Sequence, residues 1–212
     1  KQKPLQTISE GEKPFALPDG WVWCRLEELT SLLGDGLHGT PNYSEYGEYY
    51  FINGNNLING SIQFKNSTKK VNKNEFLKYK KELTDRTVLV SINGTLGNVA
   101  FYNNENIILG KSACYFNLLT NIEKTYIGLL LESKYYLDYA LSKSSKTTIN
   151  NLSLKNMRLL PVPFPTSPEQ KAIVTKVEKL LSICDQLEDQ ITTNKSHADQ
   201  LMQAALKEAF SQ

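Results

Sequence analysis

The C-terminal stretch SPEQKAIVTKVEKLLSICDQLEDQITTNKSHADQLMQAALKEAFSQ, residues 167–212, carries the strongest structural signal in this 212-residue chain. Its first residues predict a helix start. Ser167 can cap the helix, Pro168 suits the first helical position because it has no N–H to leave unpaired, and Gln170 follows the cap by three residues. Neither glycine nor proline occurs after Pro168. We therefore predict one uninterrupted helix over residues 167–212.

Apolar residues recur along this helix at alternating spacings of four and three. The resulting 3.5-residue period is typical of a coiled-coil seam and not of an ordinary globular face. One seam position is polar, and Asn194 there is the kind of residue that sets helix register at a cost in stability. The seam consists of Ile173, Val177, Leu180, Cys184, Leu187, Ile191, Asn194, Ala198, Leu201 and Ala205.

At ~1.5 Å per residue, about 42 residues of helix form a rod of roughly 63 Å. The domain that the rest of the chain can form is too small to cover such a rod. The seam therefore predicts a partner helix, from another copy or from another subunit. A lone amphipathic helix packed on its own domain is the alternative interpretation.

Composition places the chain among globular proteins, since 40% of the residues are hydrophobic and 22% are charged. No apolar run approaches the ~18 residues of a membrane span. The N-terminus lacks both a starting Met and the apolar core of a signal peptide, so a fragment or a processed chain is expected. Three distant cysteines, without a CxxC pair, predict a reduced cytoplasmic protein that holds neither zinc nor disulfides.

The net charge of +2 is distributed unevenly. Residues 61–90 contain eight basic and three acidic residues, and residues 141–160 contain four basic and no acidic ones. From Pro168 onward five basic residues face seven acidic ones. A basic globular part and a mildly acidic helix suit a domain that meets a polyanion and a helix that meets protein, although lysine-rich loops are often only solvated surface.

The residues before the long helix predict a mixed, mostly β domain of the α+β class with one or two helices. Residues 1–16 are polar and aperiodic and are interpreted as a linker arm, and residues 17–166 as the domain. Hairpin turns are predicted at Asn59-Gly60 and Asn93-Gly94. Helical spacing over Tyr126–Leu141 predicts the one convincing helix inside the domain.

Catalytic chemistry finds little support in the sequence. Gly34–Gly39 matches GxGxxG, but turn residues follow it and no acid stands about twenty residues later, so a dinucleotide site is rejected. His38 and His197 are the only histidines, which leaves no cluster for a metal and no clear base for a nucleophile. A P-loop is also absent. The sequence therefore predicts a binding protein and not an enzyme.

Four polar loops rich in Asn, Ser, Thr, Gly and Lys suggest DNA recognition. Asn can pair with adenine edges, Lys with guanine, and hydroxyls and backbone amides with phosphates. Any single loop of this kind can equally be ordinary turn sequence, but four on one basic domain favour DNA. The loops are Gly36–Asn42, Asn53–Asn56, Ser91–Thr95 and Lys143–Asn151.

Several stretches resemble the specificity subunit of type I restriction–modification systems. The resemblance covers about residues 17–210, and its last element is the most specific. The stretches are LPDGW at 17–21, DGLHGTP at 35–41, LVSINGTLG at 89–97, and NNL at 150–152 through LPVP at 160–163 into PEQKAI at 168–173.

In that family a full subunit has two target recognition domains separated by two long antiparallel helices, and each domain reads one half of a split site in double-stranded DNA. This chain departs from that pattern by holding one domain and one helix. The resemblance implies the C-terminal half of a subunit, or a naturally short one, that pairs with a second half or with itself. Two identical copies would imply a palindromic split site.

The resemblance also implies partners. The long helix would dock modification subunits, which bring S-adenosylmethionine and the catalytic residues, and through them the restriction subunit. The chain itself is expected to bind no cofactor. The competing class is a protein- or glycan-binding module on a dimerisation stalk. The residues we expect at DNA are His38, Thr40, Asn55, Asn93, Thr95, Lys143, Ser144, Lys146, Thr147, Asn150 and Asn151.

Overall fold

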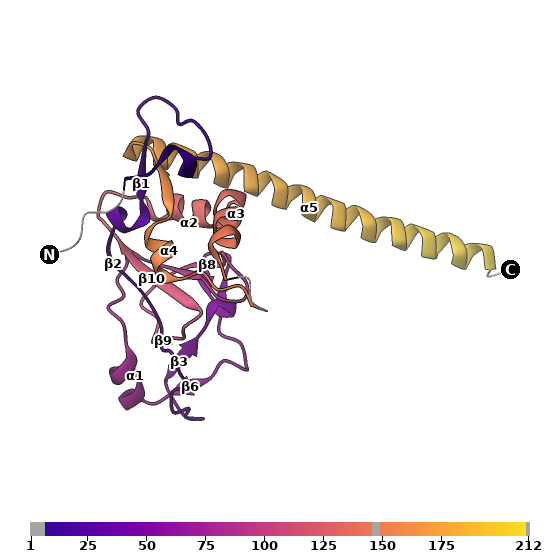
Figure 1. The fold of residues 1–212 in the computed structure, drawn as a ribbon. Helices are drawn as coiled ribbons and strands as arrows, with labels where there is room; N and C mark the ends of the chain where they lie inside the picture. Colours follow the sequence, from indigo (N-terminus) through magenta and orange to yellow (C-terminus); the bar gives the residue numbers. More distant parts are fainter. Residues whose placement is uncertain (1–6, 146–148, 211–212) are drawn as a thin grey trace. The chain divides into compact units, whose positions relative to one another are not determined.

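Short strands and short helices make up the chain as far as residue 166, and one long helix follows (Figure 1). The computed structural model describes residues 7–145 and 149–210. Two compact units make up the chain, Lys1–Gln170 and Lys171–Gln212. The expected α+β class is confirmed.

The strands all belong to the first unit. They are β1 (Val22–Arg25), β2 (Thr30–Asp35), β3 (Tyr49–Ile52), β4 (Leu57–Ile58), β5 (Ser61–Ile62), β6 (Lys70–Val71), β7 (Thr87–Ser91), β8 (Val99–Phe101), β9 (Ile107–Leu109), β10 (Ala113–Leu118) and β11 (Pro161–Phe164).

The helices comprise three 3-10 turns and five α-helices in the described residues. They are η1 (Glu10–Glu12), η2 (Leu26–Leu29), η3 (Gly54–Asn56), α1 (Lys73–Tyr79), α2 (Lys124–Glu132), α3 (Lys134–Lys143), α4 (Leu154–Arg158) and α5 (Ser167–Phe210). The short helices α1 and α4 were not predicted.

The main sheet has four antiparallel strands in the order β2-β10-β7-β8. A second sheet has the order β6-β3-β9, with β3 and β9 parallel. Every residue of β7 and β10 is buried, so these two strands form the centre of the fold. Apolar side chains from both sheets meet in one core, which includes Ile52, Leu89, Leu109 and Tyr115.

The turn predicted at Asn59-Gly60 is confirmed as a two-residue hairpin. Ile58 pairs with Ser61, and the turn residues have φ of 49° and 75°. Both central residues of a type I′ turn need positive φ, which Asn and Gly tolerate best. At Asn93-Gly94 the flanking strands β7 and β8 do pair, but the connection Ile92–Asn98 is a wider loop than a two-residue turn.

The helix predicted over Tyr126–Leu141 is two helices, α2 and α3, with a break at Ser133. Ser133 has extended backbone, and its hydroxyl donates to Leu130 O while accepting from Tyr136 N–H. One serine therefore ends α2 and caps α3. The spacing rule misses this break because apolar residues continue through it.

The segment preceding β1 packs on the domain. Arg25 is buried, and its guanidinium donates to both oxygens of Glu12, at 2.8 and 3.1 Å, and to Leu159 O at 2.7 Å. Phe15 packs on Trp23 and Tyr135, with ring centroids 5.1 and 5.8 Å apart. Residues 7–16, interpreted from sequence as a linker arm, thus carry η1 and are held by one charged pair and one aromatic cluster.

The residue that caps the long helix is Thr166, one residue before the predicted cap, Ser167. Thr166 precedes the helix, and its N–H and hydroxyl both donate to Glu169, which is a capping arrangement shifted from Ser167 and Gln170. Gln170 is fully buried and instead accepts from Glu123 N–H and donates to Pro165 O. The helix start is therefore fixed by Thr166 and Glu169.

Helix α5 reaches Phe210 without interruption, as predicted. The large apolar seam residues from Leu180 onward are more than half exposed, for example Leu187 at 53% and Leu201 at 72%. Exposed leucines in a row on one helix are costly in water. That a second helix covers these leucines remains a prediction.

Replacing Glu12 with Gln is expected to lower the free energy of unfolding by about 1–2 kcal/mol at neutral pH, because the guanidinium of buried Arg25 no longer faces a carboxylate charge at residue 12, while Glu12 itself is partly solvated. Glu10→Gln is the matched control, since it removes the same charge from an exposed pair with Lys13. Urea unfolding measures both variants. Equal stability of the two variants would contradict the role of the buried pair.

The same experiment has a pH dependence of known sign. The hydrogen bond from Arg25, followed by that from Ser9, lowers the pKa of Glu12 from 4.5 to about 2. A carboxylate whose pKa is lower in the folded than in the unfolded state stabilises the fold at pH values above the unfolded pKa. This stabilisation is lost as the pH falls through the folded pKa. The gap between the wild type and Glu12→Gln should therefore narrow as the pH drops from 4.5 towards 2.

Candidate nucleic-acid interface

Several strands end together at one edge of the domain. In the strand registers Asp35 lies opposite Cys114, Ser91 opposite Ala113, and Ile52 opposite Leu109. The loops that follow β2, β3, β7 and β9 consequently start side by side. Three of the four predicted DNA loops are among them.

The short connection Gly110–Ser112 lies at the centre of these loops. Ser112 Oγ accepts from Gly54 N–H at 2.9 Å and donates to Asn53 Oδ1 at 3.1 Å. Its carbonyl accepts from Ile92 N–H at 3.0 Å. One serine thereby fixes the loops after β3 and β7. We call Gly36–Asn42, Asn53–Asn56, Ser91–Thr95 and Gly110–Ser112 together the loop cluster.

Glycines allow the loops of the cluster to pack closely against one another. A Cβ on Gly36 would lie 2.1 Å from Leu109 O, and one on Gly110 would lie 2.1 Å from Asn53 Oδ1. Leu37 forms a parallel bridge with Gly110 in the space that the missing side chains leave. Glycine at these two positions thus permits close packing against other parts of this chain.

The fourth predicted loop joins the cluster through its last residues. Gly94 N–H donates to Asn150 O at 2.9 Å, and Asn93 forms an antiparallel bridge with Asn151. Asn150 and Asn151 are exposed. The structure therefore brings both asparagines to Asn93.

The beginning of that loop lies elsewhere. Lys143 ends α3 and lines a separate hollow of about 360 Å³ beside Glu12 and Tyr139, and the Ser144 hydroxyl donates to Leu141 O. Lys146 and Thr147 lie outside the described residues. Neither Lys143 nor Ser144 is placed in the loop cluster itself.

An open hollow of about 480 Å³ marks the polar surface of the cluster. The imidazole of His38 is exposed, and its Nε2 lies 2.5 Å from Asp35 Oδ2. Thr40 and Lys111 are also exposed. The lining residues are Leu37, His38, Gly39, Thr40, Phe51, Asn53 and Lys111.

Two predicted residues, Asn55 and Thr95, are exposed on their loops and do not line this hollow. Lys111 and Ser112 were missed in the sequence. The available signal was the Gly-Lys-Ser sequence between two apolar strands, where a break in the strand pattern marks a short loop. Nothing local indicates that this loop touches two others.

The exposed groups of the cluster suit binding. Amides, hydroxyls and an ammonium group can donate to phosphates and base edges. Burial raises the pKa of the Cys24 thiol to about 12 and also raises that of Cys114, so neither is a thiolate nucleophile at neutral pH. Among the described residues no group of three or more His, Cys, Asp or Glu could hold a metal ion.

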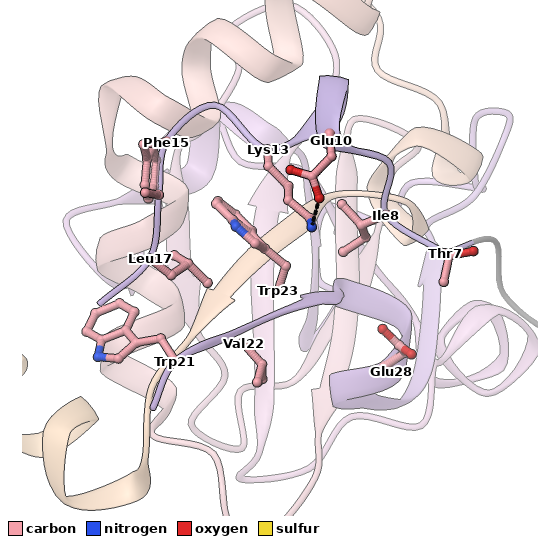
Figure 2. Close-up of a pocket in the computed structure, with 11 residues that line it drawn as sticks. Thr7, Ile8, Glu10, Lys13, Phe15, Leu17, Trp21, Val22, Trp23 and Glu28 are labelled. Carbon is pink, nitrogen blue, oxygen red and sulfur yellow. Dashed lines mark hydrogen bonds and ion pairs between the residues drawn. The ribbon is translucent and has the colours of Figure 1, made fainter. Parts of the chain in front are cut away.

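A third hollow, of about 740 Å³, lies between the N-terminal segment and β1 (Figure 2). Trp21, Trp23 and Phe15 provide aromatic walls, and the charged residues there are Glu10, Glu28 and Lys13, whose ammonium is paired with Glu10. Figure 1 places β1 at the opposite end of the domain from β3 and β6. Carboxylates and aromatic rings make this hollow a poorer match for a polyanion than the loop cluster, despite its larger volume.

No helix in the described ranges is both long enough and apolar enough to cross a bilayer.

A family model described as type I restriction modification DNA specificity domain matches residues 18–194. The EcoEI specificity subunit of a type I restriction enzyme from Escherichia coli is 28% identical over 221 residues, covering 97% of this chain and 37% of that protein. The EcoAI specificity subunit, also from Escherichia coli, is 25% identical over 219 residues, covering 97% and 36%. The chain thus spans little more than a third of these relatives.

Solved structures show the same fold. The HsdS subunit from Thermoanaerobacter tengcongensis matches with a TM-score of 0.67 at 21% identity, covering 93% of this chain and 51% of that one. A chain from a structure of the assembly of a type I R-M system matches with a TM-score of 0.66 at 20% identity, covering 93% and 47%.

Replacing Gly36 with Ala is expected to lower the free energy of unfolding by about 1–3 kcal/mol, because the new methyl group would collide with the backbone of Leu109. Gly11→Ala is the control, since nothing lies within 4 Å of a Cβ there. Urea unfolding compares the two. If Gly36→Ala is as stable as Gly11→Ala, the close approach at Leu109 is not a constraint.

Proposed function

Since this chain belongs to the type I restriction modification DNA specificity domain family, we propose that it reads one half of a bipartite site in double-stranded DNA for a restriction–modification complex. The loop cluster is the observation that carries this proposal. It collects asparagine, threonine, histidine and lysine side chains from loops distant in sequence onto one open surface. A polar surface that carries Lys111 and is built from several loops joined by hydrogen bonds suits a groove of DNA.

We assign two kinds of contact to this surface. Side-chain amides such as those of Asn93 and Asn150 can form paired hydrogen bonds with a base edge, which distinguish one base pair from another. Lysines such as Lys111 and backbone amides neutralise or hold phosphates, which gives affinity without sequence choice. The base contacts determine the sequence that is read.

Catalysis belongs to partners in this proposal. The curated relatives are named specificity subunits, and modification subunits would bring S-adenosylmethionine and the methyl-transfer residues. The restriction subunit would join through them. This chain would select the DNA site at which the partners act. It would do so in the cytoplasm and would bind no cofactor.

Helix α5 is proposed as the assembly element. Its exposed seam, which includes Leu180, Leu187, Ile191 and Leu201, matches the coiled-coil period and would pack on the helix of a second half-subunit or a second copy. A paired seam would hold two recognition domains at a set separation. The spacing between the two halves of the site would follow from that separation.

Sequencing of adenine methylation across the genome tests the recognition role. Cells that express the chain with its modification subunit should show a split motif that cells lacking the chain do not. A palindromic motif would indicate two paired copies, and an asymmetric motif a different second half. If soluble, associated proteins produce no motif, the DNA assignment of the loop cluster is wrong.

The same experiment tests a single base contact. Asn93→Ala should relax the preference at one position of the motif by about 1–3 kcal/mol, because a two-pronged contact is lost. Asn121→Ala, on the exposed loop beyond the other end of β10, is the control and should leave the motif unchanged. An unaltered motif in Asn93→Ala removes Asn93 from the contact residues.

Leu187→Asp should abolish pairing through α5 while the domain stays folded, because a charge in an apolar seam must be desolvated on association. Gln186→Asp adds the same charge beside the seam and should pair normally. Sedimentation at matched concentrations measures both, and circular dichroism checks folding. Pairing of Leu187→Asp equal to that of Gln186→Asp would show that the seam is misassigned.

A further inference from the structure

A lysine-rich turn connects β5 to β6 beside the loop cluster. We call residues Gln63–Lys70 the lysine turn. Lys65 and Lys69 are exposed, and Lys70 lies over the ring of Tyr50, 5.2 Å from its centroid. The ion pairs found among the described residues involve none of these three lysines.

The charge excess extends beyond the turn. Residues 42–81 contain seven lysines and three glutamates. Glu75 is buried and accepts from the backbone and side chain of Asn42, which leaves Glu45 and Glu48 as the exposed acids. The surface around the lysine turn is therefore cationic within a chain whose net charge is only +2.

The turn has a defined conformation. Thr68 accepts from Lys65 N–H at 2.8 Å through its hydroxyl, and its own N–H donates to Lys65 O at 2.9 Å. Phe64 stacks on Tyr50 with ring centroids 4.3 Å apart. Lys65 and Lys69 thus stand on an ordered backbone, so that less conformational entropy is lost when the turn binds a ligand.

Buried Asn56 joins the turn to the loop cluster. Its side-chain NH₂ donates to Gln63 O at 2.9 Å and to the Thr68 hydroxyl at 3.3 Å, while its Oδ1 accepts from Asn53 N–H at 3.0 Å. Lys65 Nζ also donates to Asn55 O at 3.2 Å. The lysine turn consequently keeps a fixed position beside Asn55, one of the predicted DNA residues.

We propose that the lysine turn binds the phosphates of DNA that flank the bases facing the loop cluster, with Lys65 and Lys69 as the contacting residues. This inference rests on the proposed function. Ammonium groups that form no ion pair within the described part of the chain and stand next to a base-reading surface are suited to phosphate neutralisation, because each contact releases condensed counterions. The turn would add affinity and orientation and would contribute nothing to sequence choice.

The test measures binding of the full chain to labelled duplexes of about 30 base pairs at a series of KCl concentrations. One duplex carries the sequence motif that the methylation experiment identifies, and the other carries a scrambled sequence. The variant is Lys65→Gln with Lys69→Gln. Lys13→Gln with Lys134→Gln is the control of equal charge change, since both of these lysines are paired with acids outside the turn. Lys65→Arg with Lys69→Arg retains the charge.

For two phosphate contacts the slope of log K against log salt should become less steep by about 1.8, at ~0.9 per contact, on both duplexes. The control and the arginine variant should keep the wild-type slope. In the methylation experiment the glutamine variant should yield the same sequence motif as the wild type. If the wild type binds and the glutamine variant keeps its slope, the inference fails and the proposed function stands. If the wild type binds neither duplex at low salt, the proposed function fails and this inference with it.

Discussion

Close packing against two glycines at the end of the two sheets is the constraint on which the recognition surface depends. Gly36 lies against Leu109, and Gly110 against Asn53, at distances that no side chain could occupy. Around them Ser112 uses its hydroxyl and carbonyl to hold the loops that follow β3 and β7. The loops are therefore held in place by the sheets and by hydrogen bonds to one another. These hydrogen bonds satisfy polar groups that are partly or fully buried.

Local signals in the sequence predicted those parts of the fold whose cause is local. The turn at Asn59-Gly60 needs two positive φ angles, and the long helix needs only an unbroken run without glycine or proline. The parts that were missed depend on distant partners. Nothing near Ser112 reveals its contacts with Asn53 and Ile92, because the chain brings these residues together only through strand pairing. The break at Ser133 was missed for another reason: its hydroxyl outweighs an apolar pattern that continues through it.

The family resemblance noted in the sequence acquires a physical basis in the structure. The LPDGW and PEQKAI stretches are far apart in sequence, yet Trp21 Nε1 donates to Glu169 at 3.3 Å. Strand β1, which follows the first stretch, pairs with β11, which precedes the second. Both ends of the domain thus meet at the start of α5. The exit sequence, the most specific part of the resemblance, therefore lies where the entry sequence packs against it.

The structure separates residues that form the frame from residues that face solvent. Gly36, Gly110 and Asn56 are buried, so their replacement carries the cost of a collision or an unsatisfied polar group. Thr40 and Thr95 are exposed, and substitutions at such positions usually change stability by less than about 0.5 kcal/mol. Exposed loop residues can therefore vary without loss of the frame. In a DNA-reading domain this division would let the recognised sequence change while the position of the loops, and of the lysine turn beside them, stays the same.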